Sequence, residues 1–169
     1  MTPTLRGERV TLRPLEEDDK ARLVEILEEP EVARWFGMSP PEESADEFIS
    51  DPGVIGFAIE VEREVVGAIG FYEEDTPDYR HAGMDLFLAT GSQGMGLGPE
   101  ALLLVARHLF EDRGHHRLII DPAASNARAI KAYESIGFKP VGVMRLYERG
   151  ADGSFHDGLL MDLLADELA

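Results

Sequence analysis

The sequence predicts a mixed α+β fold, in which antiparallel strands open the chain and a strand-helix-strand-helix unit adds a parallel element. Apolar residues alternate with a period of two in segments 55–61 and 80–88, as in strands with one buried face. In segment 99–110 they recur at helical spacing instead. Together the patterns predict about seven strands and about four flanking helices around one central, mostly antiparallel mixed sheet.

The N-terminal half is expected to contain strands and two helices. A strand over about residues 10–15 precedes a helix over about 16–30, whose acidic first turn suits the positive helix N-terminus. A short acidic helix follows over about 42–49. The apolar run 65–71 follows segment 55–61 after three charged residues, so the two strands are expected to form a hairpin.

The C-terminal half is expected to close the sheet. A buried strand over 118–120 leads to a helix for which Ser125 is a plausible N-cap and Gly137 the stop. Two further strands, 141–147 and 156–163, are joined by a glycine-containing turn. We find no repeat or linker, and 169 residues suffice for one domain, so we expect a single domain over residues 1–169.

Charge is the most unusual bulk property of the chain. Thirty-three acidic residues against 16 Lys and Arg give a formal net charge of −17. Such a field repels phosphate backbones, which argues against nucleic acid as a partner, and favours cationic small molecules. An acidic surface can also serve solubility alone.

Cysteine usage and apolar runs bear on the compartment. The chain has no Cys, which excludes disulfides, thiolate metal sites and a cysteine nucleophile. No run approaches the roughly 18 apolar residues of a membrane helix, and residues 1–13 lack the apolar core of a secretory signal. We therefore expect a cytoplasmic protein without a membrane partner.

The densest motif is the glycine loop Gln93-Gly94-Met95-Gly96-Leu97-Gly98, which leads into Pro99 and a helix. Alternate glycines allow sharp turns and close approach of a ligand, and Pro99 suits a first helical turn. Backbone N–H groups at a helix N-terminus form an anion site, here suited to a diphosphate. The spacing fits neither a Walker A loop nor a Gly-x-Gly-x-x-Gly fingerprint; a plain flexible connection is the alternative.

With this loop the sequence resembles the GCN5-related N-acetyltransferase (GNAT) superfamily. Gln93, Gly96 and Gly98 match its phosphate loop. Segment 121–138, with its Asn and Tyr, is similar to the second signature, and segment 9–15 to the first strand of ribosomal-protein-acetylating (RimJ/RimL-type) enzymes. Segment 93–138 looks closest to aminoglycoside 6'-N-acetyltransferases, which act in antibiotic resistance. The resemblance covers nearly the whole chain and implies the GNAT fold, with a splayed parallel strand pair.

The resemblance implies acetyl-CoA as the acetyl donor, bound between the fourth and fifth strands. Backbone groups near Phe87 and Leu88 would pair with the pantetheine arm, and one of these N–H groups would steady the oxyanion. Asn126 would hydrogen-bond the cofactor, although it could simply cap its helix. The diphosphate would bind to the loop residues Gln93, Gly94, Met95, Gly96, Leu97 and Gly98.

Two residues are candidates for proton transfer. Tyr133 lies two helical turns after Asn126 and is protonated at neutral pH, so it could protonate the departing thiolate; an ordinary buried Tyr is the alternative. The acceptor amine must lose a proton before attack, and Asp85 is the first choice of base because it interrupts an apolar strand near the cofactor gap. No covalent enzyme intermediate is expected.

The acceptor is expected to be a cationic primary amine. Candidate contacts are two aromatic residues and several carboxylates: Trp35, Phe36, Glu73, Glu74, Asp75 and Asp121. Each could instead be structural or solvated. His156 and Asp157 are held in reserve, whereas His115 and His116 are interpreted as solvated turn residues. No spacing of His, Asp and Glu suggests a metal.

Three functions remain open. An aminoglycoside-like 6'-N-acetyltransferase is favoured. A ribosomal-protein-type peptide N-terminal acetyltransferase and a non-catalytic acyl-CoA-binding module are the alternatives. We expect a monomer or homodimer, with a small-molecule amine as the partner.

Overall fold

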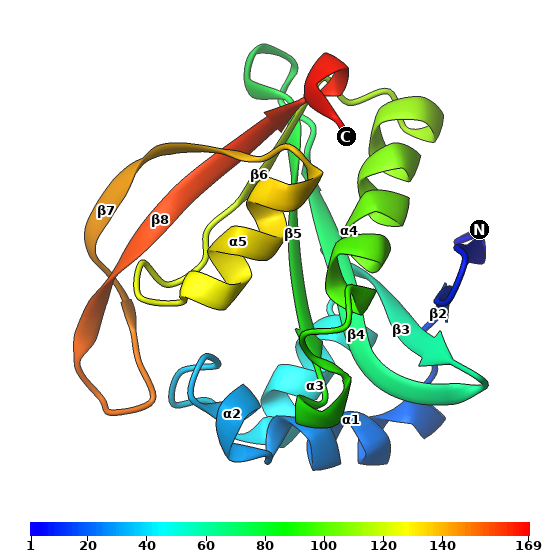
Figure 1. Cartoon of the computed structure of the whole chain (residues 1–169), viewed down its shortest axis with the longest axis vertical. Helices are drawn as coiled ribbons and strands as arrows, with labels where there is room; N and C mark the ends of the chain where they lie inside the picture. The colour runs from blue at the N-terminus through cyan, green and yellow to red at the C-terminus, as the bar shows by residue number, and fades with distance from the viewer.

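The computed structural model describes residues 1–169 as a mixed α/β structure built on one eight-stranded sheet (Figure 1). The strand order is β1-β2-β3-β4-β5-β6-β8-β7, and only the β5–β6 pair is parallel. The strands are β1 Leu5–Arg6, β2 Thr11–Pro14, β3 Ile55–Val61, β4 Glu64–Glu74, β5 His81–Leu88, β6 Arg117–Ile120, β7 Lys139–Arg149 and β8 Phe155–Leu164. The α-helices are α1 Lys20–Leu27, α2 Pro30–Ala33, α3 Pro41–Ile49, α4 Leu97–Arg107 and α5 Ala127–Ile136.

The predicted mixed sheet and all seven predicted strands are confirmed, with two additional short elements. β1 has two residues and α2 has four, which is too short for either to show a periodic pattern. The helix predicted over about 16–30 ends at Leu27, and Pro30 begins α2 instead. A proline is tolerated there because the first N–H groups of a helix have no partner within it.

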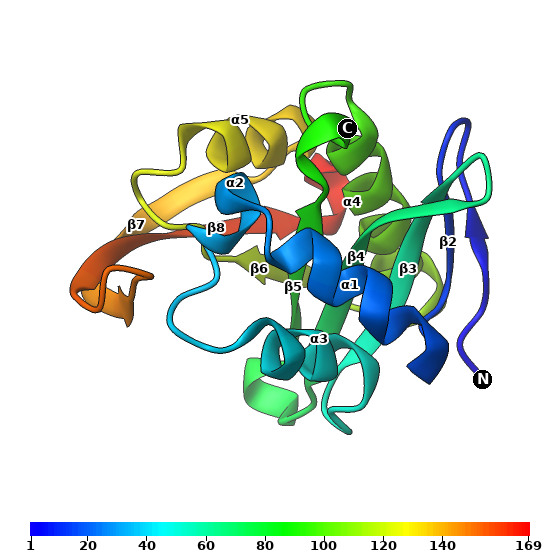
Figure 2. The ribbon, with the colours of Figure 1, turned by 90° about the horizontal axis from the view of Figure 1, so that it is seen from below.

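Helices cover both faces of the sheet. α4 and α5 lie on one face, and α1 and α3 lie on the other, as the second view makes plain (Figure 2). A core of 22 buried residues includes residues of α4, α5 and the central strands. A second core of nine residues joins α1 and α3 to β4 and β5. The two faces of β5 therefore belong to different cores.

The parallel pair β5–β6 opens into a gap. Only Ala82 with Leu118 and Gly83 with Ile119 are in register, at the beginning of β5. The rest of β5 continues beside β4 alone. This splay leaves the edge of β5 from Met84 to Leu88 without a neighbouring strand, which creates room for a ligand within the sheet.

The ends of α5 are set by short-range signals. Its N-cap is Asn126, whose Oδ1 accepts a hydrogen bond from the Ala129 N–H at 3.2 Å. The prediction of Ser125 as N-cap is therefore wrong by one residue. Gly137 ends the helix with φ of 116°, as predicted, because a residue with a side chain is strained in this conformation.

β7 and β8 form a long hairpin that projects to one side and whose turn lies near the loop after α2 (Figures 1 and 2). A Cβ atom placed on Gly37 of that loop would lie 3.2 Å from the Arg149 carbonyl oxygen, so the two segments are in close contact. None of the helices combines the length and apolar character needed to cross a bilayer.

Candidate active site

The loop before α4 presents a row of unpaired backbone donors. The N–H groups from Gly94 to Gly98 make no hydrogen bond within the protein, whereas the next N–H group, that of Glu100, donates to the Gly96 carbonyl. Pro99 between them has no N–H. Five successive free amides at the positive end of a helix form a site for an anion such as a diphosphate.

Glycines shape this loop. Gly94 and Gly96 have φ angles of +76° and +82°, where a side chain would strain the backbone. The Gln93 side chain fixes the loop to its surroundings, because its Nε2 donates to the Leu88 carbonyl at 3.0 Å and its Oε1 accepts from Arg128 at 2.8 Å. The loop is therefore joined to the end of β5 and to α5.

The free edge of β5 presents alternate peptide groups. The Ala89 N–H donates to the Val66 carbonyl of β4, so the antiparallel alternation also directs the Phe87 peptide groups to β4. Of the two residues near which free backbone groups were predicted, Phe87 therefore has its peptide groups paired with β4. The N–H groups of Leu86 and Leu88 face the gap instead, and the one of Leu86 donates to Asp85 Oδ1 at 2.9 Å. The Phe87 ring packs in the core between Phe36 and Phe48.

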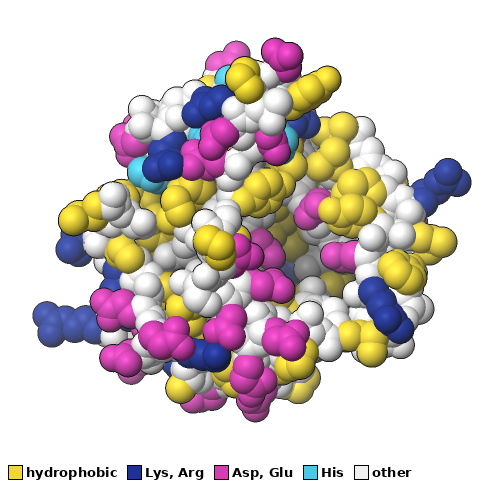
Figure 3. Space-filling model, turned by 180° about the vertical axis from the view of Figure 1, so that it is seen from behind, with side chains coloured by type: hydrophobic (Ala, Val, Ile, Leu, Met, Phe, Trp, Pro, Cys, Tyr) yellow, Lys and Arg dark blue, Asp and Glu magenta, His cyan; other side chains and the backbone are white.

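A cavity of about 710 Å³ adjoins this edge. The face opposite α4 and α5 is hollowed, and Asp and Glu side chains gather beside the hollow (Figure 3). The lining includes the predicted residues Trp35, Phe36, Asp85, Asp121, Asn126 and Tyr133. It also includes residues that no sequence pattern singled out: Glu47, Phe48, Tyr72, Tyr147, Glu148 and Arg149.

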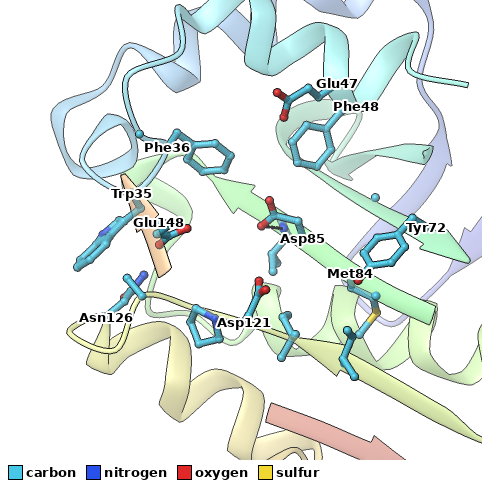
Figure 4. Close-up of a pocket in the computed structure, with 18 of the residues that line it drawn as sticks. Trp35, Phe36, Glu47, Phe48, Tyr72, Met84, Asp85, Asp121, Asn126 and Glu148 are labelled. Atoms are coloured by element: carbon cyan, nitrogen blue, oxygen red, sulfur yellow. Dashed lines mark hydrogen bonds between the residues drawn. The ribbon is translucent and has the colours of Figure 1, made fainter. Parts of the chain in front are cut away.

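Asp85 projects from β5 into the cavity, in the same space as Asp121 (Figure 4). The Asp85 side chain is exposed to the cavity. Desolvation within the concave lining raises its pKa to about 7, and the charges of Asp121, Glu148 and Glu47 add to the rise. A carboxylate whose pKa lies near neutrality suits a general base.

Asp121 follows the last residue of β6, so the strand end places it at the gap. Its Oδ2 accepts a hydrogen bond from the Tyr147 hydroxyl at 2.9 Å, which raises the pKa of Tyr147 to about 12. Burial raises the pKa of Asp121 itself, and burial together with Asp121 raises that of Glu148. Asp121 thus raises the pKa values of Asp85 and Glu148, and a cation among these carboxylates would relieve the repulsion.

Tyr133 reaches the cavity from α5, on the other side of the sheet from α3. Its side chain is 7% exposed, and its hydroxyl makes no hydrogen bond within the protein. Burial raises its pKa above the ordinary value, and the charges of Asp85 and Asp121 act in the same direction. The phenol therefore stays protonated at neutral pH and can donate a hydrogen bond into the gap.

Asn126 has the capping role that was the alternative for it, and its amide nitrogen stays available for the predicted cofactor contact. Its Oδ1 caps α5, which leaves the Nδ2 hydrogens unpaired beside the cavity. Trp35 and Phe36 lie at the end of α2 and form one wall, where Arg34 stacks over the Trp35 ring at 4.7 Å (Figure 4). A smaller hollow of about 300 Å³ adjoins this wall and is lined by His156 and the β7–β8 turn.

Glu73 and Glu74 lie outside the cavity lining. Two charged bonds from Arg113 and one from His115 Nε2 at 2.6 Å hold the Glu73 carboxylate. Arg113, with a further contribution from His115, lowers the pKa of Glu73 to about 2. Glu74 accepts a hydrogen bond from the Thr76 N–H.

His115 corrects a prediction. It was interpreted as a solvated turn residue, but it is 3% exposed, whereas its neighbour His116 is exposed as predicted. The turn bends inward, where the partly buried Glu73 carboxylate of β4 is the partner of the imidazole. Asp75 is exposed, and Asp157 accepts a hydrogen bond from the Leu146 N–H. Neither residue lines the cavity.

Comparison with known proteins identifies the family. The family model described as "Acetyltransferase (GNAT) domain" matches residues 9–139. The aminoglycoside N(6')-acetyltransferase type 1 of Klebsiella pneumoniae is 30% identical over 161 residues, covering 83% of this chain and 79% of that protein.

Two solved structures share the fold. Mycobacterium smegmatis RimJ in complex with CoA-disulfide has a TM-score of 0.84 at 22% identity, over 98% of this chain and 87% of that one. AAC(6')-Ib in complex with Parmomycin and AcetylCoA has a TM-score of 0.77 at 24% identity, over 95% of this chain and 96% of that one. The splayed sheet and the free loop amides agree with these matches. The match to the family model over residues 9–139, together with the 30% identical relative, shows that the chain belongs to the GNAT family and is an acetyltransferase.

Proposed function

We propose that this acetyltransferase moves an acetyl group from acetyl-CoA to a primary amine of a cationic amino sugar of the aminoglycoside type, at the 6'-amino position. One observation carries the proposal: a single cavity holds Asp85, Asp121 and the Tyr133 hydroxyl beside the free edge of β5. The relative that is 30% identical acts on aminoglycosides, which supports the choice of acceptor.

Acetyl-CoA fits the residues present. The five free amides from Gly94 to Gly98 suit its diphosphate, and the unpaired edge of β5 suits the amide-containing pantetheine arm as an added strand would. Both features lie along β5 on the way to Asp85. The thioester would therefore lie beside the Asp85 carboxylate and the Tyr133 hydroxyl. Solved relatives of the same fold bind CoA or acetyl-CoA.

The chemistry follows from the two proton-transfer groups. Asp85 accepts a proton from the ammonium, directly or through water, and the amine nitrogen attacks the thioester carbonyl carbon. The Leu88 N–H at the free edge steadies the oxyanion. The C–S bond then breaks, and Tyr133 donates its proton to the thiolate; the nitrogen loses its second proton, which returns to the tyrosinate directly or through water.

The charge of the cavity supports a cationic acceptor. Four carboxylates line it, those of Glu47, Asp85, Asp121 and Glu148, against the one guanidinium of Arg149. An acceptor with several ammonium groups would pair with these carboxylates and relieve their mutual repulsion. Trp35 could pack against the apolar face of a sugar ring.

A Tyr133→Phe variant tests the proposal. Removing only the hydroxyl should leave CoA affinity unchanged, because the loop amides are untouched, and lower kcat by about 100-fold or more. CoA affinity is measured by calorimetry and turnover by release of free thiol with kanamycin-like sugars. Unchanged turnover in Tyr133→Phe removes Tyr133 from the mechanism. Absence of turnover by the wild-type protein with every amine supports a non-catalytic CoA-binding module.

A peptide N-terminus is the second candidate acceptor. The adjoining hollow of about 300 Å³ extends the cavity along Arg34 and Arg149, and could receive the chain that follows a terminal residue. Kinetics with basic peptides against amino sugars distinguish the two acceptors. Preference for peptides by more than about tenfold in kcat/KM, which is about 1.4 kcal/mol, would replace the amino sugar.

A further inference from the structure

Arg9 lies against the glycine loop from the opposite end of the sequence. Its Nη1 donates to the Met95 carbonyl oxygen at 2.7 Å. A Cβ atom placed on Gly96 would lie 2.9 Å from its Nη2, so the guanidinium packs directly on the loop backbone. Nothing in the chemistry described above requires this contact.

Glu100, in the first turn of α4, fixes Arg9 in turn. Its Oε1 accepts from the backbone N–H groups of Arg9 and Val10 at 2.7 and 3.1 Å, and its Oε2 accepts from Arg9 Nε at 3.2 Å. The Glu100 side chain is 16% exposed, so these bonds are partly shielded from water. The segment before β2, the loop and α4 are thereby held together by one ion pair.

This arrangement fixes the direction of a loop amide. The peptide bond between Met95 and Gly96 is planar and trans, so its carbonyl oxygen and its N–H point in opposite directions. Because Arg9 holds the Met95 oxygen, the Gly96 N–H must face away from Arg9. That N–H is one of the five free donors of the loop.

The charge of Arg9 adds to this effect. A protein of net charge −17 opposes the binding of a polyanion such as CoA, so a cation at the loop matters more here than in a neutral protein. Arg9 Nη2 has no hydrogen-bond partner, and the Arg9 side chain is 50% exposed. Arg128, bonded to Gln93, supplies the cation at the other end of the loop.

We propose that Arg9 is a positioning residue for acetyl-CoA: it holds the Met95 carbonyl so that the Gly96 N–H faces the diphosphate, and the edge of its guanidinium that Glu100 leaves free presents positive charge to the loop. The proposal rests on the proposed use of the loop as the diphosphate site. It adds a residue outside the loop, 86 positions from Met95 in the sequence, to the donor-binding site.

The test compares Arg9→Gln with a matched control, Arg6→Gln. Arg6 is exposed, lies three residues earlier and makes no hydrogen bond or ion pair. Loss of a charged hydrogen bond should raise the KM for acetyl-CoA about tenfold in Arg9→Gln, with kcat and the KM for the amine within about twofold of wild type. Arg6→Gln should match wild type, and Arg9→Lys should recover part of the loss through its charge.

A donor without a diphosphate separates positioning from general stability. With S-acetyl-pantetheine, wild type and Arg9→Gln should have equal kcat/KM, because no phosphate reaches the loop. An equal loss with both donors, or an unchanged KM for acetyl-CoA, overturns the role of Arg9. Failure of the wild-type protein to bind acetyl-CoA would instead overturn the proposed function itself, so the two failures are distinguishable.

Discussion

Among single residues, Asp85 carries the clearest consequence of its surroundings. The same residue type has an ordinary pKa of 3.8, whereas desolvation within the cavity and three nearby carboxylates raise the pKa of Asp85 to about 7. Only the carboxylate form could act as the proposed base. Activity should therefore respond to pH in the physiological range.

The plot of kcat/KM against pH is expected to rise through an apparent pKa of about 7 and then level off, because Asp85 must lose its proton before it can act as the base. Measuring initial rates from pH 5.5 to 9 gives the profile. In Asp85→Asn the rate should fall, and the rise of kcat/KM through this pKa should disappear. If the variant shows the same rise, the titration belongs to the acceptor amine or to another residue.

The pKa of Glu73 is shifted in the opposite direction to that of Asp85, and its consequence is for stability instead of catalysis. Its pKa is lowered from 4.5 to about 2 by Arg113 and His115. A lowered folded-state pKa means that the stabilisation is present above the unfolded pKa and is lost as pH falls from about 4.5 towards 2. Glu73→Gln should therefore have a lower Tm than wild type at pH 7, and the difference in Tm between the two should be smaller at pH 3.

Glu73 also lies outside the cavity, so the same variant should leave the KM for the amine within about twofold of wild type. Thermal unfolding followed by circular dichroism gives the first result and steady-state kinetics the second. A KM for the amine that rises severalfold without loss of Tm would return Glu73 to the acceptor site.

Among the secondary structure elements, the loop before α4 depends on backbone conformation more than on side chains. The glycines within it and just before it differ in what they require. Gly91 has neither a positive φ nor an atom near its added Cβ, Gly94 has a positive φ alone, and Gly96 has a positive φ and the Arg9 guanidinium nearby. This allows a graded series of alanine substitutions.

Gly91→Ala is expected to be neutral, and Gly94→Ala should lose about 1 kcal/mol of stability from the left-handed backbone. Gly96→Ala should lose more and should weaken CoA binding most, because the methyl group displaces Arg9 from Met95. Urea denaturation and CoA calorimetry measure the two effects. Equal CoA affinity in all three variants would show that the loop does not bind the donor.

For the molecule taken together, net charge and cavity charge have the same sign. The formal charge is −17, and carboxylates outnumber the one guanidinium in the cavity lining. A field of this kind draws in cations and disfavours the anionic donor, and dissolved salt screens both effects. The two substrates should therefore respond to ionic strength in opposite directions.

Raising NaCl from about 20 to about 500 mM should increase the KM for a polycationic acceptor severalfold, because the Debye length falls to a few ångströms. The KM for acetyl-CoA should stay constant or fall. Initial-rate kinetics at several salt concentrations measure both, with a singly charged amine as the control that should change little. Equal salt dependence of the single and multiple cations would argue against charge-based recognition of the acceptor.

Local signals in the sequence were sufficient for most of the fold. The two-residue period of β3 and β5, the acidic start of α3 and the Gly137 stop act over a few residues, so each could be interpreted alone. The glycine loop could be singled out in the same way, because alternating glycines directly before a helix allow sharp turns and close approach of an anion.

The composition of the cavity depends on how distant segments meet. Glu47, Tyr147 and Glu148 carry no local signature, and they join Asp85 only because α3 and the β7–β8 hairpin fold beside the splay of β5 and β6. Glu73 looked like a substrate contact until Arg113 and His115 were found beside it. The use of the Phe87 N–H was likewise decided by pairing with β4.

The difference has a physical cause. Helix and strand preferences, caps and tight turns depend on short-range sterics and hydrogen bonds, and these are written in adjacent residues. The pKa of Asp85, the partner of Glu73 and the direction of the loop amides depend on charges and contacts brought together from segments far apart in the chain, as Arg9 and Met95 are. These charges and contacts come together only when the chain has folded.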